Sequence, residues 1–109
     1  MTVEIRTTAS PSGRLTVVVV GEIDMANAAR LDEAITTARA GGRGPVVVDL
    51  TAAGYFDSAG VRVLFQHAAE AELHVRAAPG GIVAAVLATA ALDKVAAVDG
   101  LSVASGERE

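Results

Sequence analysis

The chain has 109 residues, of which 51% are hydrophobic and 20% charged, so it can bury the core of one compact domain and leaves little for a second. A formal charge of −4 argues against a nucleic-acid partner, because such a partner requires a clustered basic surface. The chain has no cysteine, which excludes a disulfide, a thiol nucleophile and a metal site with cysteine ligands.

The first part of the chain has the pattern of a β-hairpin. Residues 3–8 alternate apolar and polar side chains, which predicts a half-exposed strand at the edge of a sheet. A turn signal at residues 10–13 separates them from a fully apolar strand at residues 15–20. Because the connection is short, we expect these two strands to pair antiparallel.

A helix of about four turns should follow, between Asp24 or Asn27 as its cap and the glycine-rich residues 41–44. Its apolar side chains recur at helical spacing and share one face: Ala28, Leu31, Ile35 and Ala38. Another apolar strand starts at Val46. A helix between two apolar strands predicts a right-handed parallel crossover.

The stretch from Val46 to Val61 is the centre of the sequence. It begins with a β-branched run that is typical of a strand buried on both faces, and Asp49 inside this strand should be structural. Asp57 and Ser58 then precede a new helical periodicity, predicted to run to about Ala71. The apolar face of this helix should consist of Val61, Leu64, Phe65 and Ala68. Ser58 therefore lies at or next to a helix N-terminus, where a hydroxyl can be exposed and an added phosphate is electrostatically favoured.

The remaining pattern predicts a strand at residues 73–77, a turn at 78–81, an alanine-rich helix at 82–92 and a short strand at 95–98. The order β-β-α-β-α-β-α-β predicts a single α/β domain over residues 3–98. Its sheet should be mixed but mostly parallel, with the N-terminal antiparallel hairpin at one edge and the helices packed on it. Residues 99–109 are polar and should form a C-terminal tail.

No segment has the pattern of a targeting or membrane-spanning sequence. Residues 1–6 lack the apolar stretch of a signal peptide. The longest run without a charged residue, 77–92, contains Pro79 and two glycines, and its apolar part is too short to cross a bilayer. We therefore expect a cytoplasmic protein that does not insert into membranes.

Ser58 is the first candidate for chemistry, although a serine at this position can also be a helix cap and nothing more. A hydrolase is disfavoured, because there is no nucleophile-elbow motif and both histidines, His67 and His74, should lie on the surface away from Ser58. Asp24 and Asp57 follow neighbouring strands and can flank Ser58, or can simply cap helices. A receiver domain phosphorylated on aspartate fits poorly, because its paired acidic residues and its lysine are not at the required places.

Three segments in this order resemble the STAS domain family, and in particular bacterial anti-sigma factor antagonists. They are residues 21–24 (GEID), 46–50 (VVVDL) and 56–61 (FDSAGV), and the likeness extends over about residues 3–98. The resemblance implies that Ser58 is phosphorylated by an anti-sigma factor that is also a serine kinase. It places Asp24, Asp57, Ala59 and Gly60 around this phosphorylation site. Ala59 stands where many relatives have a second serine, which leaves Ser58 as the unambiguous acceptor.

The resemblance also implies a partner-switching mechanism. The unmodified protein would bind the anti-sigma factor kinase and free the sigma factor, phosphorylation would end binding, and a phosphatase would reset the switch. The chain would be a substrate rather than an enzyme, without a cofactor or a metal ion of its own, because the kinase brings ATP and Mg²⁺. The docking surface should be the start of the Ser58 helix, with Arg62, Val63 and Gln66 on its exposed side.

Two other functions stay open. The chain can be a STAS subunit of a non-sigma assembly, such as a lipid-transport complex or a stress-signalling scaffold, in which Ser58 is only a cap. It can also be a sensor of a small molecule that uses the loops around Asp24 and Ser58. Gly60 either allows a partner to approach closely or permits a tight entry into its helix.

Overall fold

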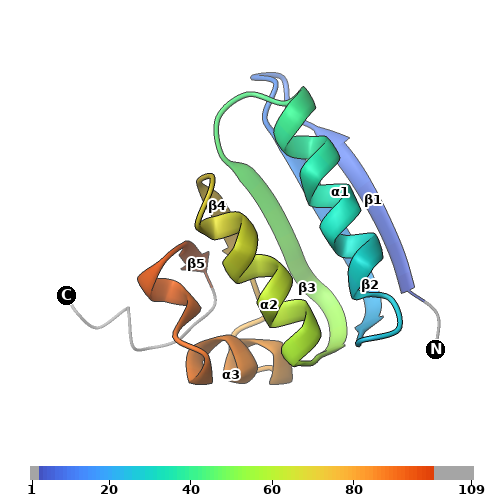
Figure 1. Ribbon diagram of the computed structural model, residues 1–109, viewed down its shortest axis with the longest axis vertical. Coiled ribbons are helices and arrows are strands. Elements are labelled where there is room, and N and C mark those ends of the chain that lie inside the picture. The colour runs from blue at the N-terminus through green and yellow to red at the C-terminus, as the bar shows by residue number, and fades with distance from the viewer. Residues whose placement is uncertain (1–2, 100–109) are drawn as a thin grey trace.

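The computed structural model describes residues 3–99, which form one five-stranded sheet and its helices (Figure 1). The elements in chain order are β1 (Val3–Ala9), β2 (Leu15–Ile23), α1 (Ala28–Gly41), β3 (Val46–Phe56), α2 (Ser58–Ala68), β4 (Leu73–Arg76), α3 (Ile82–Thr89), the 3₁₀ helix η1 (Leu92–Lys94) and β5 (Ala97–Asp99). The strands lie in the order β1-β2-β3-β4-β5. The β1–β2 pair is antiparallel and the other three pairs are parallel, which confirms the predicted fold class.

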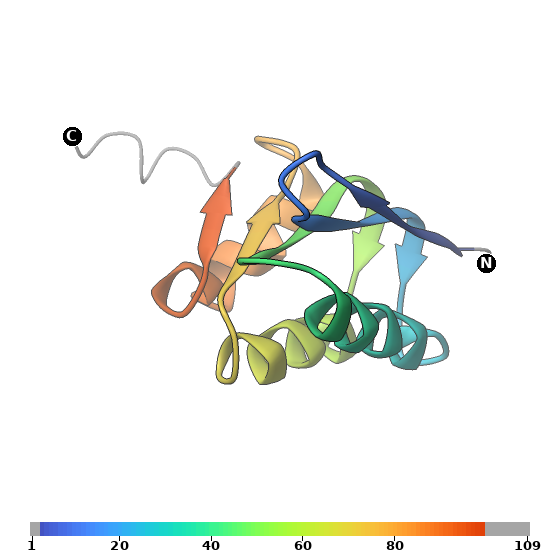
Figure 2. The same ribbon diagram turned by 90° about the horizontal axis from the view of Figure 1, so that it is seen from above.

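Helices α1 and α2 lie side by side over one face of the sheet (Figures 1 and 2). The core lies between them and the strands, and the four predicted apolar residues of α1 are all buried there. No helix within residues 3–99 covers the opposite face, where side chains such as Val18, Asp49 and Arg76 keep partial or full exposure. None of the helices in these residues has the length and apolarity needed to span a membrane.

Three segments lie together at the end of the sheet where β3 ends: α3, the β2–α1 loop and the start of α2. β3 is 11 residues long, whereas β4 has four, so the second half of β3 continues past its neighbour. Helix α3 packs beside this second half, and the β2–α1 loop and the start of α2 lie at the same end (Figure 1). As expected for parallel strands, the segments that follow β2 and β3 therefore meet.

Several predicted boundaries differ from the structure. The central strand continues to Phe56, so Asp57 alone joins it to α2. Helix α2 ends at Ala68 rather than Ala71, α3 ends at Thr89, and the last strand starts at Ala97. Asp99 belongs to this strand, and residues 100–109 of the predicted tail lie outside the described residues.

Helix α2 turns a different face inwards from the one predicted. Its buried residues are Gly60, Val63, Leu64 and His67, whereas Val61, Phe65 and Ala68 are only partly buried. The predictions that Val63 lies on the exposed side and that His67 lies on the surface are therefore wrong. Only 7% of Val63 and 5% of His67 are exposed.

Candidate functional site

The candidate site is the junction between β3 and α2. The Asp57 carboxylate accepts hydrogen bonds from the backbone N–H groups of Ala59, at 2.8 Å, and Gly60, at 3.4 Å. A carboxylate at this place satisfies helix donors that would otherwise be unpaired and interacts favourably with the helix dipole. Asp57 is thus the N-cap of α2, and Ser58 is its first helical residue.

This assignment leaves the Ser58 hydroxyl free for another role. Ser58 is exposed, and its hydroxyl takes part in no side-chain hydrogen bond within residues 3–99. The interpretation of Ser58 as a helix cap and nothing more is therefore not supported.

The β2–α1 loop lies directly beside the junction. The Asp57 N–H donates to the Ile23 carbonyl oxygen at 3.2 Å, which ties the two connections together. Asp24 is half-buried, and its carboxylate accepts a hydrogen bond from the Ala26 N–H at 2.9 Å. Asn27 occupies the N-cap position of α1 without a side-chain cap bond, because its side chain holds the loop through Asp24 N–H, at 3.0 Å, and the Glu22 carbonyl, at 2.9 Å.

Gly60 determines how closely α2 approaches the sheet. A Cβ atom at this residue would lie 2.8 Å from Phe56 Cζ and 2.9 Å from Ile23 Cγ2. Both side chains are fully buried. Gly60 therefore serves the tight entry into α2 rather than the approach of a partner. It also brings the row of residues 60, 63, 64 and 67 to the core, which explains the rotation of the helix relative to the prediction.

Arg62 and Gln66, two of the three predicted contact residues on α2, are exposed, whereas Val63 is buried and cannot serve as a contact. The structure adds an apolar hollow of about 380 Å³ between α2 and α3, which the prediction missed. Its lining residues are Ser58, Val61, Ile82, Ala85, Val86, Thr89 and Ala90.

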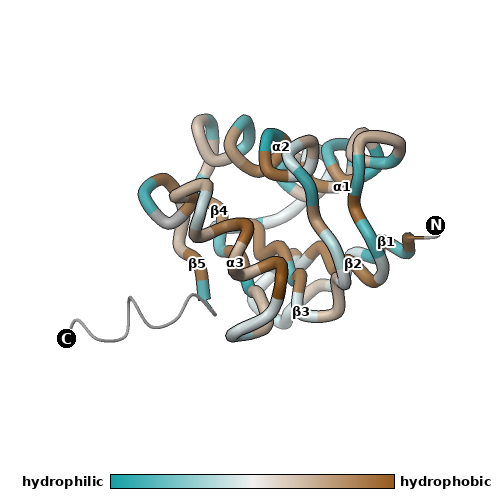
Figure 3. The backbone as a smooth tube through the Cα atoms, turned by 90° about the horizontal axis from the view of Figure 1, so that it is seen from below, coloured by the Kyte–Doolittle hydropathy of each residue, from teal (hydrophilic) through white to brown (hydrophobic). Residues whose placement is uncertain are grey.

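The hollow continues into an outer surface of α3 that has no charged residue. Val83, Ala84 and Leu87 face the core, while Ile82 on the outside is 54% exposed. Figure 3 shows the hydrophobic character of α3 along most of its length. A surface helix normally carries polar residues on its outer face. The uncharged run at residues 77–92 was the available sequence signal, but it could not show that one side of the helix stays exposed.

No group of three or more histidine or acidic side chains within residues 3–99 has an arrangement that could hold a metal ion. The junction thus combines an exposed serine, an engaged carboxylate and an apolar hollow.

The chain is thus a single α/β domain with a mixed five-stranded sheet. A serine begins the helix that follows the central strand of this sheet. A family model described as "Mlab, STAS domain" matches residues 7–101. The chain belongs to the STAS domain family. No functionally curated protein matches the sequence.

Solved structures with the same fold include two anti-sigma factor antagonists. One, from Mycobacterium paratuberculosis, is 24% identical with a TM-score of 0.80, and the alignment covers 90% of this chain and 86% of that one. The other, SpoIIAA in its unphosphorylated form, is 16% identical with a TM-score of 0.67, and 87% of each chain is covered. An uncharacterised protein from Shewanella loihica PV-4 with a SpoIIAA-like fold is 13% identical, with a TM-score of 0.58 and coverage of 95% and 88%. At these identities the likeness shows the fold.

Proposed function

We propose that this chain is an anti-sigma factor antagonist, and that phosphorylation of Ser58 by the anti-sigma factor, acting as a serine kinase, ends their binding. The observation that carries the proposal is the exposed Ser58 hydroxyl at the start of α2, beside a carboxylate that already performs the capping. The likeness to two anti-sigma factor antagonists, one of them described in an unphosphorylated form, agrees with it.

Phosphorylation would change the charge of the docking surface without a change of fold. A phosphate adds about −1.5 to −2 charges. The backbone N–H groups of Ala59 and Gly60 are already used, because both donate to the Asp57 carboxylate. A docked partner would therefore bury the phosphate together with a like charge, which costs several kcal/mol. The unmodified protein binds, the phosphorylated protein dissociates, and a phosphatase restores the first state.

The docking surface extends from Ser58 over the hollow between α2 and α3. Val61 and Ile82 offer apolar contacts on either side of it, and Arg62 and Gln66 are exposed on the neighbouring surface of α2. A serine at the rim of an apolar hollow is well placed for control, because a phosphate there adds a strongly hydrated group where the partner needs a dry contact. The kinase supplies ATP, Mg²⁺ and the catalytic base, so this chain is the substrate of the reaction and not an enzyme.

A second candidate is a STAS subunit of a non-sigma assembly. The uncharged outer surface of α3 favours it, because this surface suits permanent packing against another subunit as well as reversible docking. In that case another subunit of the assembly occupies the hollow between α2 and α3, and Ser58 is not phosphorylated.

The test is incubation of the purified protein with candidate anti-sigma factor kinases and ATP, followed by mass spectrometry and a binding assay. Phosphate on Ser58, none on Ser58→Ala, and loss of kinase binding by Ser58→Asp are expected. Ser12→Asp adds the same charge at an exposed serine in the β1–β2 turn and should bind normally. Binding retained by Ser58→Asp would contradict the switch, and a stable partner that is not a kinase would support the second candidate.

A further inference from the structure

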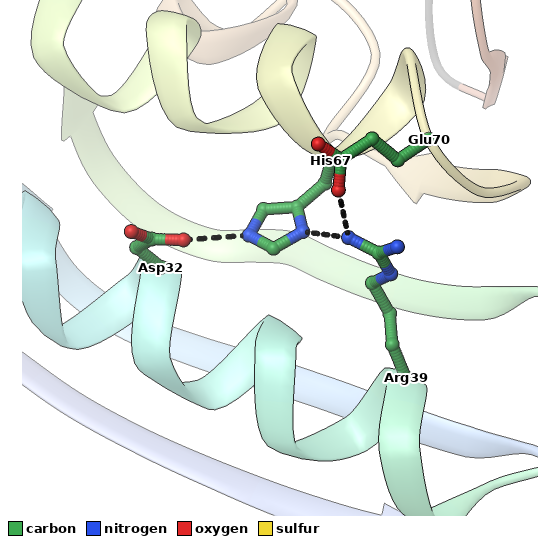
Figure 4. Close-up of polar contacts among 4 residues, drawn as sticks. All are labelled: Asp32, Arg39, His67 and Glu70. Carbon is green, nitrogen blue, oxygen red and sulfur yellow. Dashed lines mark hydrogen bonds and ion pairs between the residues drawn. The ribbon is translucent and has the colours of Figure 1, made fainter.

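A chain of polar contacts joins α1 to the end of α2, on the part of α2 farthest from Ser58 (Figure 4). Nε2 of His67 lies 2.7 Å from Asp32 Oδ1, and Nδ1 of His67 lies 2.9 Å from an Nη nitrogen of Arg39. The same Arg39 nitrogen donates to Glu70 Oε1 at 3.1 Å. His67 is buried, whereas Asp32 is about half exposed and Glu70 is largely exposed.

The two partners of the ring determine the hydrogen-bonding role of each ring nitrogen in this arrangement. A guanidinium group can only donate hydrogen bonds, so Nδ1 of His67 must accept with its lone pair. A carboxylate can only accept, so Nε2 of His67 must carry the proton and donate to Asp32. In this arrangement Nε2 of His67 donates to Asp32, and Nδ1 accepts from Arg39. Asp32 and Arg39 from α1, and Glu70 from the turn after α2 through Arg39, are the charged side chains that face it among the described residues.

We propose that His67 is a proton-controlled clasp that holds Arg39 when neutral and releases it when protonated. A proton from solvent that binds Nδ1 turns this acceptor into a donor, and two donors would then face each other across 2.9 Å. The contact with Asp32 persists, because the Nε2 proton stays in place and the attraction becomes an ion pair. The Arg39 side chain then moves away from His67. Its ion pair with Glu70 moves with it, because the Glu70 side chain is largely exposed and not held by packing.

The release changes the surface between the two helices. An open groove of about 680 Å³ lies there. It is lined by His67 and its three charged neighbours, Asp32, Arg39 and Glu70, together with Thr36, Ala40 and Gln66. In the neutral state, Arg39 bridges the groove from α1 to His67 on α2 and to Glu70 in the turn after it. In the protonated state this bridge opens and the groove gains positive charge. The face formed by α1 and α2 thus responds to pH independently of Ser58.

Nitrogen-15 NMR of the labelled wild-type protein, from about pH 8 to about pH 5, tests the clasp. At high pH, the ring of His67 should show a protonated Nε2 and an unprotonated Nδ1, and the Arg39 guanidinium should show restricted rotation. As His67 gains its second proton, the Arg39 signals should lose this restriction in step with it. The inference is overturned by an Nδ1–H tautomer at high pH, or by Arg39 signals that stay unchanged through the titration of His67.

His74 on β4 is an internal control, because Nε2 of its ring lies 3.5 Å from Glu72 Oε2 and does not contact Arg39. Protonation of His74 should therefore leave the Arg39 signals unchanged. A second measurement uses Arg39→Met, which keeps the aliphatic stem and removes the donor. The Tm advantage of the wild type over Arg39→Met should shrink as the pH falls through the titration of His67. The matched variant Arg62→Met changes an exposed arginine on α2 and should show a constant difference. If Arg39→Met does not fold, the wild-type spectra decide alone.

Discussion

Replacement of Gly60 by alanine should destabilise the protein, because the added methyl group has no space. Its carbon would lie 2.8 Å from Phe56 Cζ and 2.9 Å from both Phe56 Cε2 and Ile23 Cγ2. Real Cβ atoms do not make contacts this short, so one of these side chains or the helix itself must shift. Both side chains have zero exposure and belong to the main core, so neither can move into solvent.

The expected loss follows from two opposing effects. Inserting a methyl-sized group into a well-packed core costs about 1–3 kcal/mol, and three contacts below 3.0 Å put this case in the upper half of that range. Alanine is the better helix former, which returns at most about 1 kcal/mol near a helix end. The net loss in the free energy of unfolding is about 1–3 kcal/mol, equivalent to a decrease in Tm of roughly 4–24 °C for a domain of this size.

Urea unfolding followed by circular dichroism measures this loss. Gly54→Ala is the matched control, because a Cβ at Gly54 in β3 meets no heavy atom within 4 Å. Its free energy of unfolding should stay within about 1 kcal/mol of the wild type. A Gly60→Ala protein that is as stable as Gly54→Ala would refute the argument that contact with Phe56 and Ile23 positions the start of α2. Since Ser58 lies two residues earlier, the shifted helix should also be phosphorylated more slowly if the proposed function is correct.

Variants at Asp57, Val63 and Ser58, with matched controls, test the site further. Asp57→Ala should lose about 1 kcal/mol of stability in urea unfolding, whereas Asp57→Asn keeps an acceptor for the helix N–H groups and should lose less; equal losses would contradict the capping role. Val63→Ala removes buried apolar volume and should cost about 2 kcal/mol, while Arg62→Ala should stay within about 0.5 kcal/mol in the same assay. Ser58→Asp should melt within a few degrees of the wild type, because Ser58 is exposed and makes no cap bond, and a large drop in Tm would mean that loss of binding reflects misfolding.

The local pattern of the chain was sufficient for the order of elements and for the place of Ser58. Alternation with period two and apolar spacing near 3.6 residues are properties of single strands and helices, so they can be recognised before any packing is known. The four buried residues of α1 agree with the prediction because that helix presents one apolar stripe to the sheet. The hairpin, the parallel crossovers and the meeting of the loops after β2 and β3 follow from connection length and strand direction.

The rotation of α2 about its axis was decided only by tertiary packing. Its sequence has apolar residues on more than one side, and the side that turns inwards depends on the close contact of Gly60 with Phe56 and Ile23. That rotation buries Val63 and carries His67 to the Asp32 and Arg39 side chains of α1, which lie 35 and 28 residues away in the chain. It also leaves Val61 at the hollow beside α3. The sequence by itself thus determined which segments form and where the serine stands. Contacts between distant segments decided which side chains of α2 are buried and which partners they meet. The physical reason is that periodicity within one segment contains no information about the surface against which that segment will pack.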